Sequence, residues 1–310
     1  MIWFLLVLIV AGAIIWGAKF CYRIAFYNLN EKEQDLYIIP PGKQYESVAD
    51  VMLQNIQELE QLPFEQLCIT ARDGVHLVAR YYHFKDNAPV QILFHGYRGN
   101  GVREYSCGNK MAAQLGYNTI VVDERAHGKS GGHTISFGIK ERYDCADWAK
   151  YASERFGENT PIFLSGVSMG AATVLMASEL SLPKNVVAIT ADCPYSSPGA
   201  IIRKVCKDVK IPSVLAYPFV VLGALLYGHF RIWESSPVKA VQHTSIPILL
   251  IHGEDDRFVP CDMSREIYRA CVGPRKLVTF PEAGHGLSYL TDTPRYQRIM
   301  RSFLQQHHAI

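Results

Sequence analysis

The sequence predicts an α/β protein with a mostly parallel sheet and helices on both of its faces. Apolar strands alternate with helical stretches in a regular order along most of the chain. The strands are apolar without interruption, which is typical of a parallel sheet that is buried on both faces. The chain has 310 residues, of which 49% are hydrophobic and 19% are charged, so it can build one large domain with a deep core.

The first segment is expected to be a membrane anchor. Residues 2–18 carry no charge, and a helix of about 17–20 apolar residues can span a hydrocarbon core. No basic residue precedes this run, and its small residues lie inside it, so it does not fit a cleaved signal peptide. Lys19, Arg23 and Lys32 follow it, and basic residues mark the cytoplasmic side. We therefore expect residues 1–23 to form a single-pass anchor with a cytoplasmic domain behind it.

The rest of the chain divides into two parts. Residues 24–66 contain an amphipathic helical pattern and are expected to form a linker and a packing helix. Residues 67–310 hold the α/β domain, which begins with a hairpin that turns at Asp73-Gly74. Six further strands are expected at residues 90–96, 117–124, 161–166, 186–193, 246–253 and 275–280. Helices are expected near residues 105–115, 139–156, 169–180, 262–271 and 292–307.

Ser168 is the candidate nucleophile. It follows an apolar strand, opens a helix, and has Gly166 and Gly170 two residues away on either side. This spacing suits a sharp strand-to-helix turn, and such turns lie where parallel sheets collect their chemistry, at the carboxyl ends of strands. A serine hydroxyl needs a neighbouring base, and the base needs a third group to orient it.

His285 is the expected base among the eleven histidines, because it lies in a glycine-flanked loop after the last strand. His95, His127 and His252 also lie at strand ends, but glycine follows each of them directly, and we interpret these three as parts of structural turns.

Asp256 is the expected orienting acid, since the turn that follows it leads into the next helix. Its neighbours Glu254 and Asp255 are expected to be solvated. Asp192, at the end of the preceding strand, is an alternative acid.

Two backbone amides are expected to hold the oxyanion of the reaction. One belongs to Met169, the residue after the nucleophile, at the N-terminus of a helix. The other is expected from the loop after the strand at residues 90–96, where Tyr97 is the predicted donor.

Together these motifs resemble those of the α/β-hydrolase superfamily, over residues 67–307. The resemblance is carried by His95-Gly96 and by residues 123–132, 166–170, 253–260 and 284–286. It is strongest to the branch that holds monoglyceride lipases, small-ester esterases and prolyl aminopeptidases. The α/β-hydrolase fold and a serine hydrolase activity are thereby implied, with Ser168, Asp256 and His285 as the triad in the expected chain order. The amides of Tyr97 and Met169 would supply the oxyanion hole, no metal or other cofactor is implied, and residues 123–132 would be structural.

The stretch between the fourth and fifth of these six strands is too long for a simple crossover. Residues 194–246 lie where the resembling family inserts a lid, and residues 211–228 carry no charge. A second membrane span there would separate Ser168 from the other two triad residues, and Pro212 and Pro218 would break it. We therefore expect a lid helix that is buried or that dips into the membrane.

The expected function is that of a serine hydrolase, an esterase or lipase that cleaves carboxylic esters of apolar or lipid-like acyl groups through an acyl-enzyme. A peptidase or thioesterase with the same triad remains an alternative, as does a non-catalytic binding protein of the same fold. The expected partners are a small acyl substrate and the membrane. A net charge of +2 without a basic stripe argues against nucleic acid, and the oligomeric state stays open.

Overall fold

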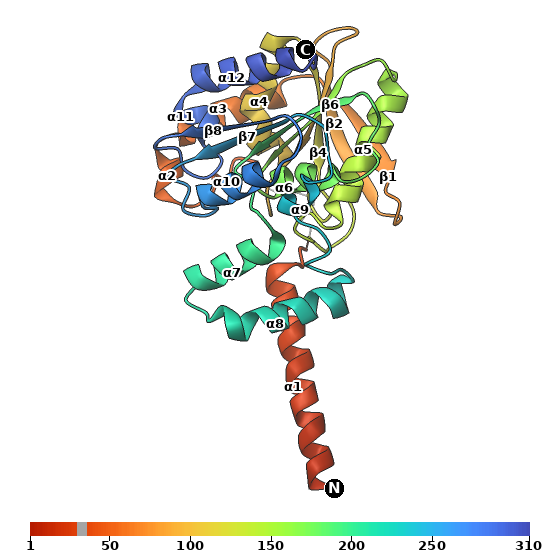
Figure 1. Ribbon diagram of the computed structural model, residues 1–310, viewed down its shortest axis with the longest axis vertical. Coiled ribbons are helices and arrows are strands. Elements are labelled where there is room, and N and C mark those ends of the chain that lie inside the picture. The colour runs from red at the N-terminus through yellow and green to blue at the C-terminus, as the bar shows by residue number, and fades with distance from the viewer. Residues whose placement is uncertain (30–35) are drawn as a thin grey trace.

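The computed structural model describes residues 1–29 and 36–310, so Lys32 of the charge argument lies outside the described residues. An eight-stranded sheet forms its centre, in the order β1-β2-β4-β3-β5-β6-β7-β8 (Figure 1). The strands are β1 (Glu65–Thr70), β2 (His76–Tyr82), β3 (Val90–Phe94), β4 (Asn118–Asp123), β5 (Ile162–Val167), β6 (Val186–Asp192), β7 (Ile248–Gly253) and β8 (Arg275–Phe280).

The sheet is mostly parallel, as predicted. β2 pairs antiparallel with β1 and with β4, and every other neighbouring pair is parallel. The six strands after the hairpin begin and end within two residues of their predicted limits. This agreement follows from their composition, because an uninterrupted apolar run of this length is typical of a parallel strand that is buried on both faces.

Helices cover both faces of the sheet. They are α3 (Ala49–Glu60), α4 (Gly101–Leu115), α5 (Glu141–Phe156), α6 (Met169–Ala177), α10 (Cys261–Ala270), α11 (Ser288–Thr291) and α12 (Thr293–Gln306). On one face Phe163 of β5 packs in a cluster with residues of α4 and α12. On the other face its neighbour Leu164 packs with residues of α5, α6 and α10. Successive residues of one strand thus reach opposite cores, as the two-residue period of a strand requires.

The turn at residues 123–132 has the structural role that was expected of it. Arg125 is buried, and its guanidinium lies 2.8 Å from a carboxylate oxygen of Asp73 and 2.6 Å from one of Asp144. The ion pairs tie the loop after β4 to the β1–β2 hairpin and to α5.

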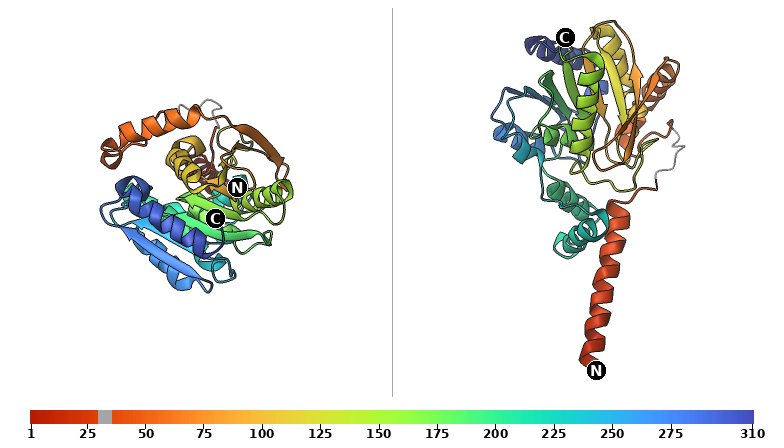
Figure 2. Two further views of the ribbon diagram at one scale, coloured as in Figure 1. Left: turned by 90° about the horizontal axis from the view of Figure 1, so that it is seen from above. Right: turned by 90° about the vertical axis from the view of Figure 1, so that its right-hand side faces the viewer.

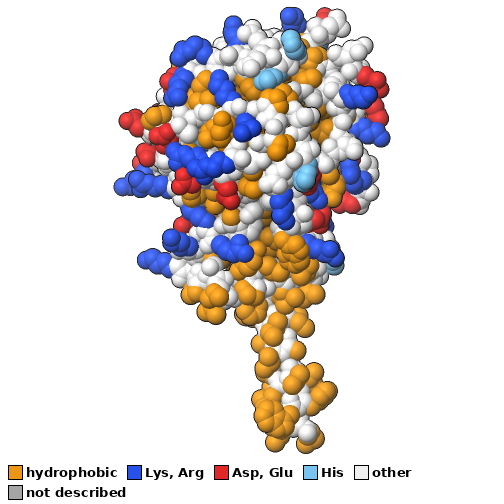
Figure 3. Space-filling model, viewed as in Figure 1, with side chains coloured by type: hydrophobic (Ala, Val, Ile, Leu, Met, Phe, Trp, Pro, Cys, Tyr) orange, Lys and Arg blue, Asp and Glu red, His pale blue; other side chains and the backbone are white. Residues whose placement is uncertain are grey.

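The N-terminal helix α1 (Ile2–Ala25) extends away from the sheet, as Figures 1 and 2 show. Among the described residues it is the one helix long and apolar enough to cross a membrane. Its surface is almost entirely apolar in Figure 3, and most of its large side chains are exposed. These are the properties expected of a membrane anchor.

The segment between β6 and β7 forms four short helices. They are α7 (Pro198–Asp208), α8 (Ser213–Gly223), the π-helix η1 (Ala224–Gly228) and α9 (Pro237–Ala240). In Figure 1, α8 runs across the C-terminal end of α1 rather than beside it as a second span. Pro218 lies inside α8, and η1 continues it with a wider turn. Whether these helices act as a lid stays a prediction.

Glycines bring α1 and α8 into close contact. A Cβ atom on Gly223 would lie 2.6 Å from the carbonyl oxygen of Ala18, and one on Gly17 would lie 2.9 Å from the ring of Phe219. The two helices therefore pack with almost no space between their backbones, an arrangement that small residues permit.

The variant Gly223→Val is expected to weaken this packing, because the new methyl groups would meet the backbone of α1. Overpacking of this kind costs about 1–3 kcal/mol of unfolding free energy. Thermal unfolding in detergent micelles would show a lower Tm. Gly12→Val is the matched control, since no atom lies within 4 Å of a Cβ atom at that position. An unchanged Tm in Gly223→Val, or an equal fall in both variants, would contradict the packing.

Candidate active site

Ser168 lies in a strained turn between β5 and α6. Its backbone has φ 53° and ψ −111°, a region that costs a residue with a side chain about 1–3 kcal/mol. A Cβ atom on Gly166 would lie 2.2 Å from the carbonyl carbon of Gly170, and one on Gly170 would lie 1.9 Å from the carbonyl oxygen of Phe94. Both positions therefore exclude any larger residue, which explains the glycine spacing around the serine.

The three predicted triad side chains meet at the carboxyl ends of β5, β7 and β8. The Nε2 atom of His285 lies 3.0 Å from the Oγ atom of Ser168, and its Nδ1 atom lies 2.6 Å from the Oδ2 atom of Asp256. With the Nδ1 proton donated to the carboxylate, Nε2 is free to accept the proton of the serine hydroxyl. This is the arrangement that a serine nucleophile needs.

Asp256 is held in place by its own turn. Its Oδ1 atom accepts hydrogen bonds from the amides of Phe258 at 2.9 Å and Val259 at 2.8 Å. Burial acts to raise the pKa of Asp256, but hydrogen bonds from His252, His285 and the Val259 amide outweigh it and hold the pKa below its usual range. The carboxylate is therefore charged at neutral pH and can stabilise an imidazolium.

The alternative acid Asp192 lies near the site but its carboxyl group does not bind the imidazole of His285. It is buried, and burial raises its pKa to about 6 despite the nearby His252 and His285. Among the described residues its carboxyl group hydrogen bonds with Ser288 and Tyr296, whereas the Nδ1 atom of His285 pairs with Asp256. Glu254 and Asp255 are exposed, as expected.

The three other strand-end histidines are buried and engaged in hydrogen bonds. The Nε2 atom of His95 accepts from the amide of Glu124 at 3.0 Å, and that of His127 accepts from the amide of Arg98 at 3.0 Å. Burial lowers the pKa of His127 to about 4, so it stays neutral and structural. His252 was expected to be only a part of a turn, but it also contacts the triad acid. Its Nε2 atom lies 3.4 Å from the Oδ2 atom of Asp256 and donates to the carbonyl of Val259.

The loop after β3 lies directly against the nucleophile. A Cβ atom on Gly96 would lie 3.4 Å from that of Ser168. The amide of Gly96 donates to Glu104 at 2.6 Å and that of Arg98 donates to His127, whereas the amide of Tyr97 has no partner within the described part of the chain. Met169 opens α6, where the first amides have no partner in the helix. The two predicted oxyanion donors are thus available, and their role stays a prediction.

Glu104 is a site residue that the sequence did not indicate. It belongs to α4 and its side chain fills the space beside Gly99, where a Cβ atom would lie 1.8 Å from its Oε1 atom. Burial raises the pKa of Glu104, while Arg103 and the Gly96 amide counteract the shift. Nothing in the sequence spacing relates it to the serine, because the contact arises from the fold.

One group of side chains near His285 has the geometry of a metal site. The ligand atoms of Cys193, Asp256 and His285 lie within 4.8 Å of one another. Burial raises the pKa of Cys193 well above its usual range, which keeps its sulfur protonated and a poor ligand. His285 and Asp256 already bind each other, so these residues fit a proton-transfer site better than a metal centre.

Two family models match parts of the chain. Residues 86–210 match the one described as serine aminopeptidase, S33, and residues 199–287 match the one described as serine hydrolase, FSH1. Both ranges include residues of the site described above.

Curated relatives and solved structures agree with these matches. The uncharacterized protein YqkD of Bacillus subtilis is 25% identical over 297 residues, which cover 96% of this chain and 94% of that protein. The lysophosphatidylserine lipase ABHD12 of Rattus norvegicus is 26% identical over 242 residues, which cover 70% of this chain and 56% of that protein. The chain thus spans little more than half of that lipase. An esterase structure from Pyrococcus furiosus shares the fold with a TM-score of 0.65 at 23% identity, covering 91% of this chain and 99% of that one.

Two isosteric variants separate the candidate acids. Asp256→Asn should slow the reaction of Ser168 with a fluorophosphonate probe by about 10³–10⁴-fold, because the amide would favour the wrong histidine tautomer. Asp192→Asn should change this rate by less than about tenfold, since its carboxyl group does not bind His285. Labelling rates measured by gel fluorescence would decide. Equal losses in both variants would overturn the assignment of Asp256.

The strained serine turn, the hydrogen-bonded histidine and carboxylate, and the matched families lead to one conclusion. The chain has the α/β-hydrolase fold, and its similarity to serine hydrolases, esterases and lipases supports a hydrolase activity.

Proposed function

We propose that the protein is a membrane-anchored esterase or lipase that cleaves carboxylic esters through an acyl-enzyme on Ser168. The observation that supports it most is the unbroken pair of hydrogen bonds from Ser168 to His285 and from His285 to Asp256. Esterase and lipase names among the similar proteins favour an ester as the substrate.

In the first half of the reaction, the Oγ atom of Ser168 attacks the ester carbonyl carbon while Nε2 of His285 takes its proton. Asp256 stabilises the resulting imidazolium, and the amides of Tyr97 and Met169 bind the oxyanion. The tetrahedral intermediate then expels the alcohol, which receives the proton from Nε2. In the second half, a water molecule gives its proton to Nε2 and attacks the acyl group. The acid leaves and Ser168 recovers its proton.

The surroundings of α1 favour an apolar acyl group. The loop before α8 and its first turn expose large apolar side chains next to the anchor, and Val214 is 79% exposed and Leu215 64%. Figure 3 shows this apolar surface continuing from α1 onto the adjoining helices. An amphiphile in the bilayer would therefore meet the enzyme at this end. Ser168 is only 7% exposed, which favours a lid function for residues 194–246.

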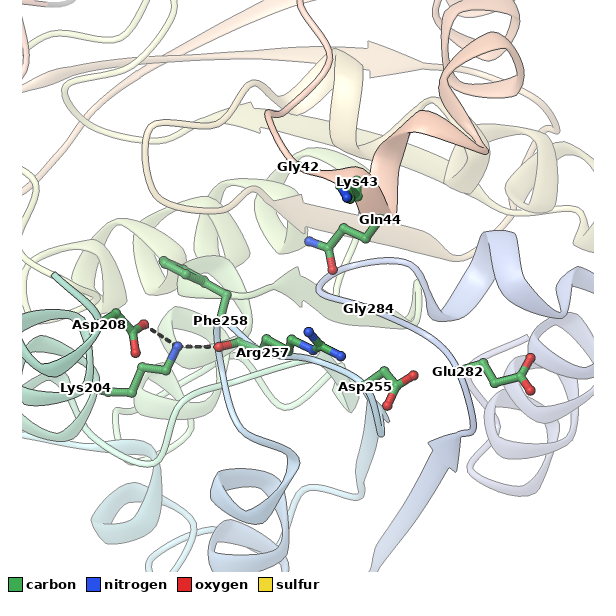
Figure 4. A pocket seen from close by; sticks show the side chains of 10 residues that line it. All are labelled: Gly42, Lys43, Gln44, Lys204, Asp208, Asp255, Arg257, Phe258, Glu282 and Gly284. Atoms are coloured by element: carbon green, nitrogen blue, oxygen red, sulfur yellow. Dashed lines mark hydrogen bonds and ion pairs between the residues drawn. The ribbon is translucent and has the colours of Figure 1, made fainter.

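A cavity beside His285 suits a polar leaving group. It has a volume of about 630 Å³, and its lining includes Gln44, Phe258 and Gly284 and the charged residues Lys43, Lys204, Asp208, Asp255, Arg257 and Glu282 (Figure 4). The leaving alcohol takes its proton from Nε2 of His285, and the nearness of the cavity to the His285 loop favours it as the place of the head group. An apolar acyl chain and a charged head group together describe a membrane amphiphile.

An aminopeptidase is the second candidate, because the family model over residues 86–210 carries that description. Such an enzyme needs a carboxylate to bind the free amine of its substrate. Glu104 is a half-buried carboxylate beside Gly96, but it already accepts the amide of that residue. This engagement favours the ester over the peptide.

Chain-length dependence tests the substrate class. Turnover of p-nitrophenyl esters from acetate to palmitate should show kcat/KM rising by at least about tenfold between two and ten carbons, because each buried methylene contributes about 0.8 kcal/mol. Ser168→Ala should abolish turnover, and Ser181→Ala, at an exposed position, should not. A profile that is flat or limited to short chains would remove the lipid part of the proposal. Hydrolysis of aminoacyl amides in preference to esters would favour the peptidase.

The orientation of the anchor is proposed to leave the catalytic domain in the cytoplasm, because Lys19 and Arg23 lie on the domain side of the apolar run. Cys68 is the exposed cysteine of the eight. A membrane-impermeant maleimide should label Cys68 in lysed cells but not in intact cells, and Cys68→Ser should remove the signal. Labelling in intact cells would place the domain outside.

A further inference from the structure

A short helix from the N-terminal segment contacts the loop that carries His285. This helix is α2 (Lys43–Glu46), which lies 240 residues before the loop in the sequence. The hydroxyl of Tyr45 donates a hydrogen bond to the carbonyl oxygen of His285 at 3.0 Å. The amide of His285 donates to the Oε1 atom of Gln44 at 3.3 Å. Two consecutive side chains thus bind both backbone polar groups of the same histidine.

The contact is close as well as polar. A Cβ atom on Gly284 would lie 2.1 Å from the Oε1 atom of Gln44, so a side chain at that position would displace the amide group. Figure 4 shows the Gln44 side chain pointing from α2 toward the loop at Gly284. Glycine at this position lets the loop pack directly on α2.

The loop needs such an external restraint. Glycine flanks His285 on both sides, and Gly286 has φ 67°, so the backbone here has more conformational freedom than other residues would allow. Within the described part of the chain, Gln44 and Tyr45 are the hydrogen-bond partners of the His285 backbone. The imidazole has to hold distances of 3.0 Å to Ser168 and 2.6 Å to Asp256 at the same time.

Tyr45 also lies beside the charged part of the site. Burial, followed by the neighbouring Cys193, Asp256 and Glu104, raises its pKa. The phenol therefore keeps its proton and remains a hydrogen-bond donor throughout the pH range in which a histidine base works.

We propose that Gln44 and Tyr45 are positioning residues, which hold the His285 loop so that the imidazole bridges Ser168 and Asp256. The inference rests on the proposed function in that it takes these three residues as the catalytic groups. The segment that joins the membrane anchor to the α/β domain then contributes to the reaction, because it holds the catalytic base in position.

Point variants in the full-length chain test this role. Tyr45→Phe and Gln44→Leu each remove one hydrogen bond and keep most of the side-chain volume. We expect kcat for a p-nitrophenyl ester to fall about tenfold in each and about 100-fold in the double variant, because a misplacement near 1 Å can cost about 10² in rate. KM should change less than twofold, and fluorophosphonate labelling of Ser168 should slow in parallel. Gln44→Glu keeps an acceptor for the His285 amide and should recover most of the rate lost in Gln44→Leu.

Matched controls lie in the same N-terminal segment. Tyr37 hydrogen bonds with Glu60, and the Nε2 atom of Gln54 donates to Glu58 at 2.9 Å, away from His285. Tyr37→Phe and Gln54→Leu should therefore leave kcat within twofold. Thermal unfolding of all variants would show whether a loss of rate is only a loss of folded protein.

Three results would overturn the proposal. They are an unchanged kcat in both test variants, an effect confined to KM, and an equal loss in the controls. Failure of the proposed function would look different, since Ser168→Ala would then retain turnover and labelling whatever stands at positions 44 and 45.

Discussion

The hydrogen bonds of the His285 imidazole are the constraint on which the site depends. One ring nitrogen must accept from Ser168 while the other donates to Asp256, and the structure holds both distances within the range of normal hydrogen bonds. The three residues follow β5, β7 and β8, which run parallel in one sheet. Parallel strands end at the same edge, so the sheet brings Ser168 and His285 together although they lie 117 positions apart.

The rigid sheet also supports the strained backbone of Ser168. Its φ of 53° would be unfavourable in a loop with freedom to relax. Gly166 and Gly170 allow β5, β3 and α6 to approach so closely that the turn has no room to adopt another conformation. The strain places the hydroxyl toward the histidine, and it leaves the amide of Met169 at the open end of α6.

Most of the fold and the three central side chains could be predicted because each leaves a local signal. Buried parallel strands require apolar runs, and the serine turn requires glycines at fixed spacing. Glu104, Gln44, Tyr45 and the contact of His252 with Asp256 left no such signal, since they arise from segments that meet only in the folded chain. The sequence favoured Asp256 over Asp192 as the orienting acid but could not exclude Asp192, because both residues lie at the carboxyl ends of strands at the same edge of the sheet.

The crystal structure of the protein inhibited by an alkyl fluorophosphonate would test the account most directly. We expect a covalent bond from phosphorus to the Oγ atom of Ser168. One phosphonyl oxygen should lie about 2.7–3.1 Å from the amides of Tyr97 and Met169. Nε2 of His285 should face the adduct and Nδ1 should bind Asp256. An adduct on another residue, or an imidazole turned away from Ser168 and Asp256, would contradict it.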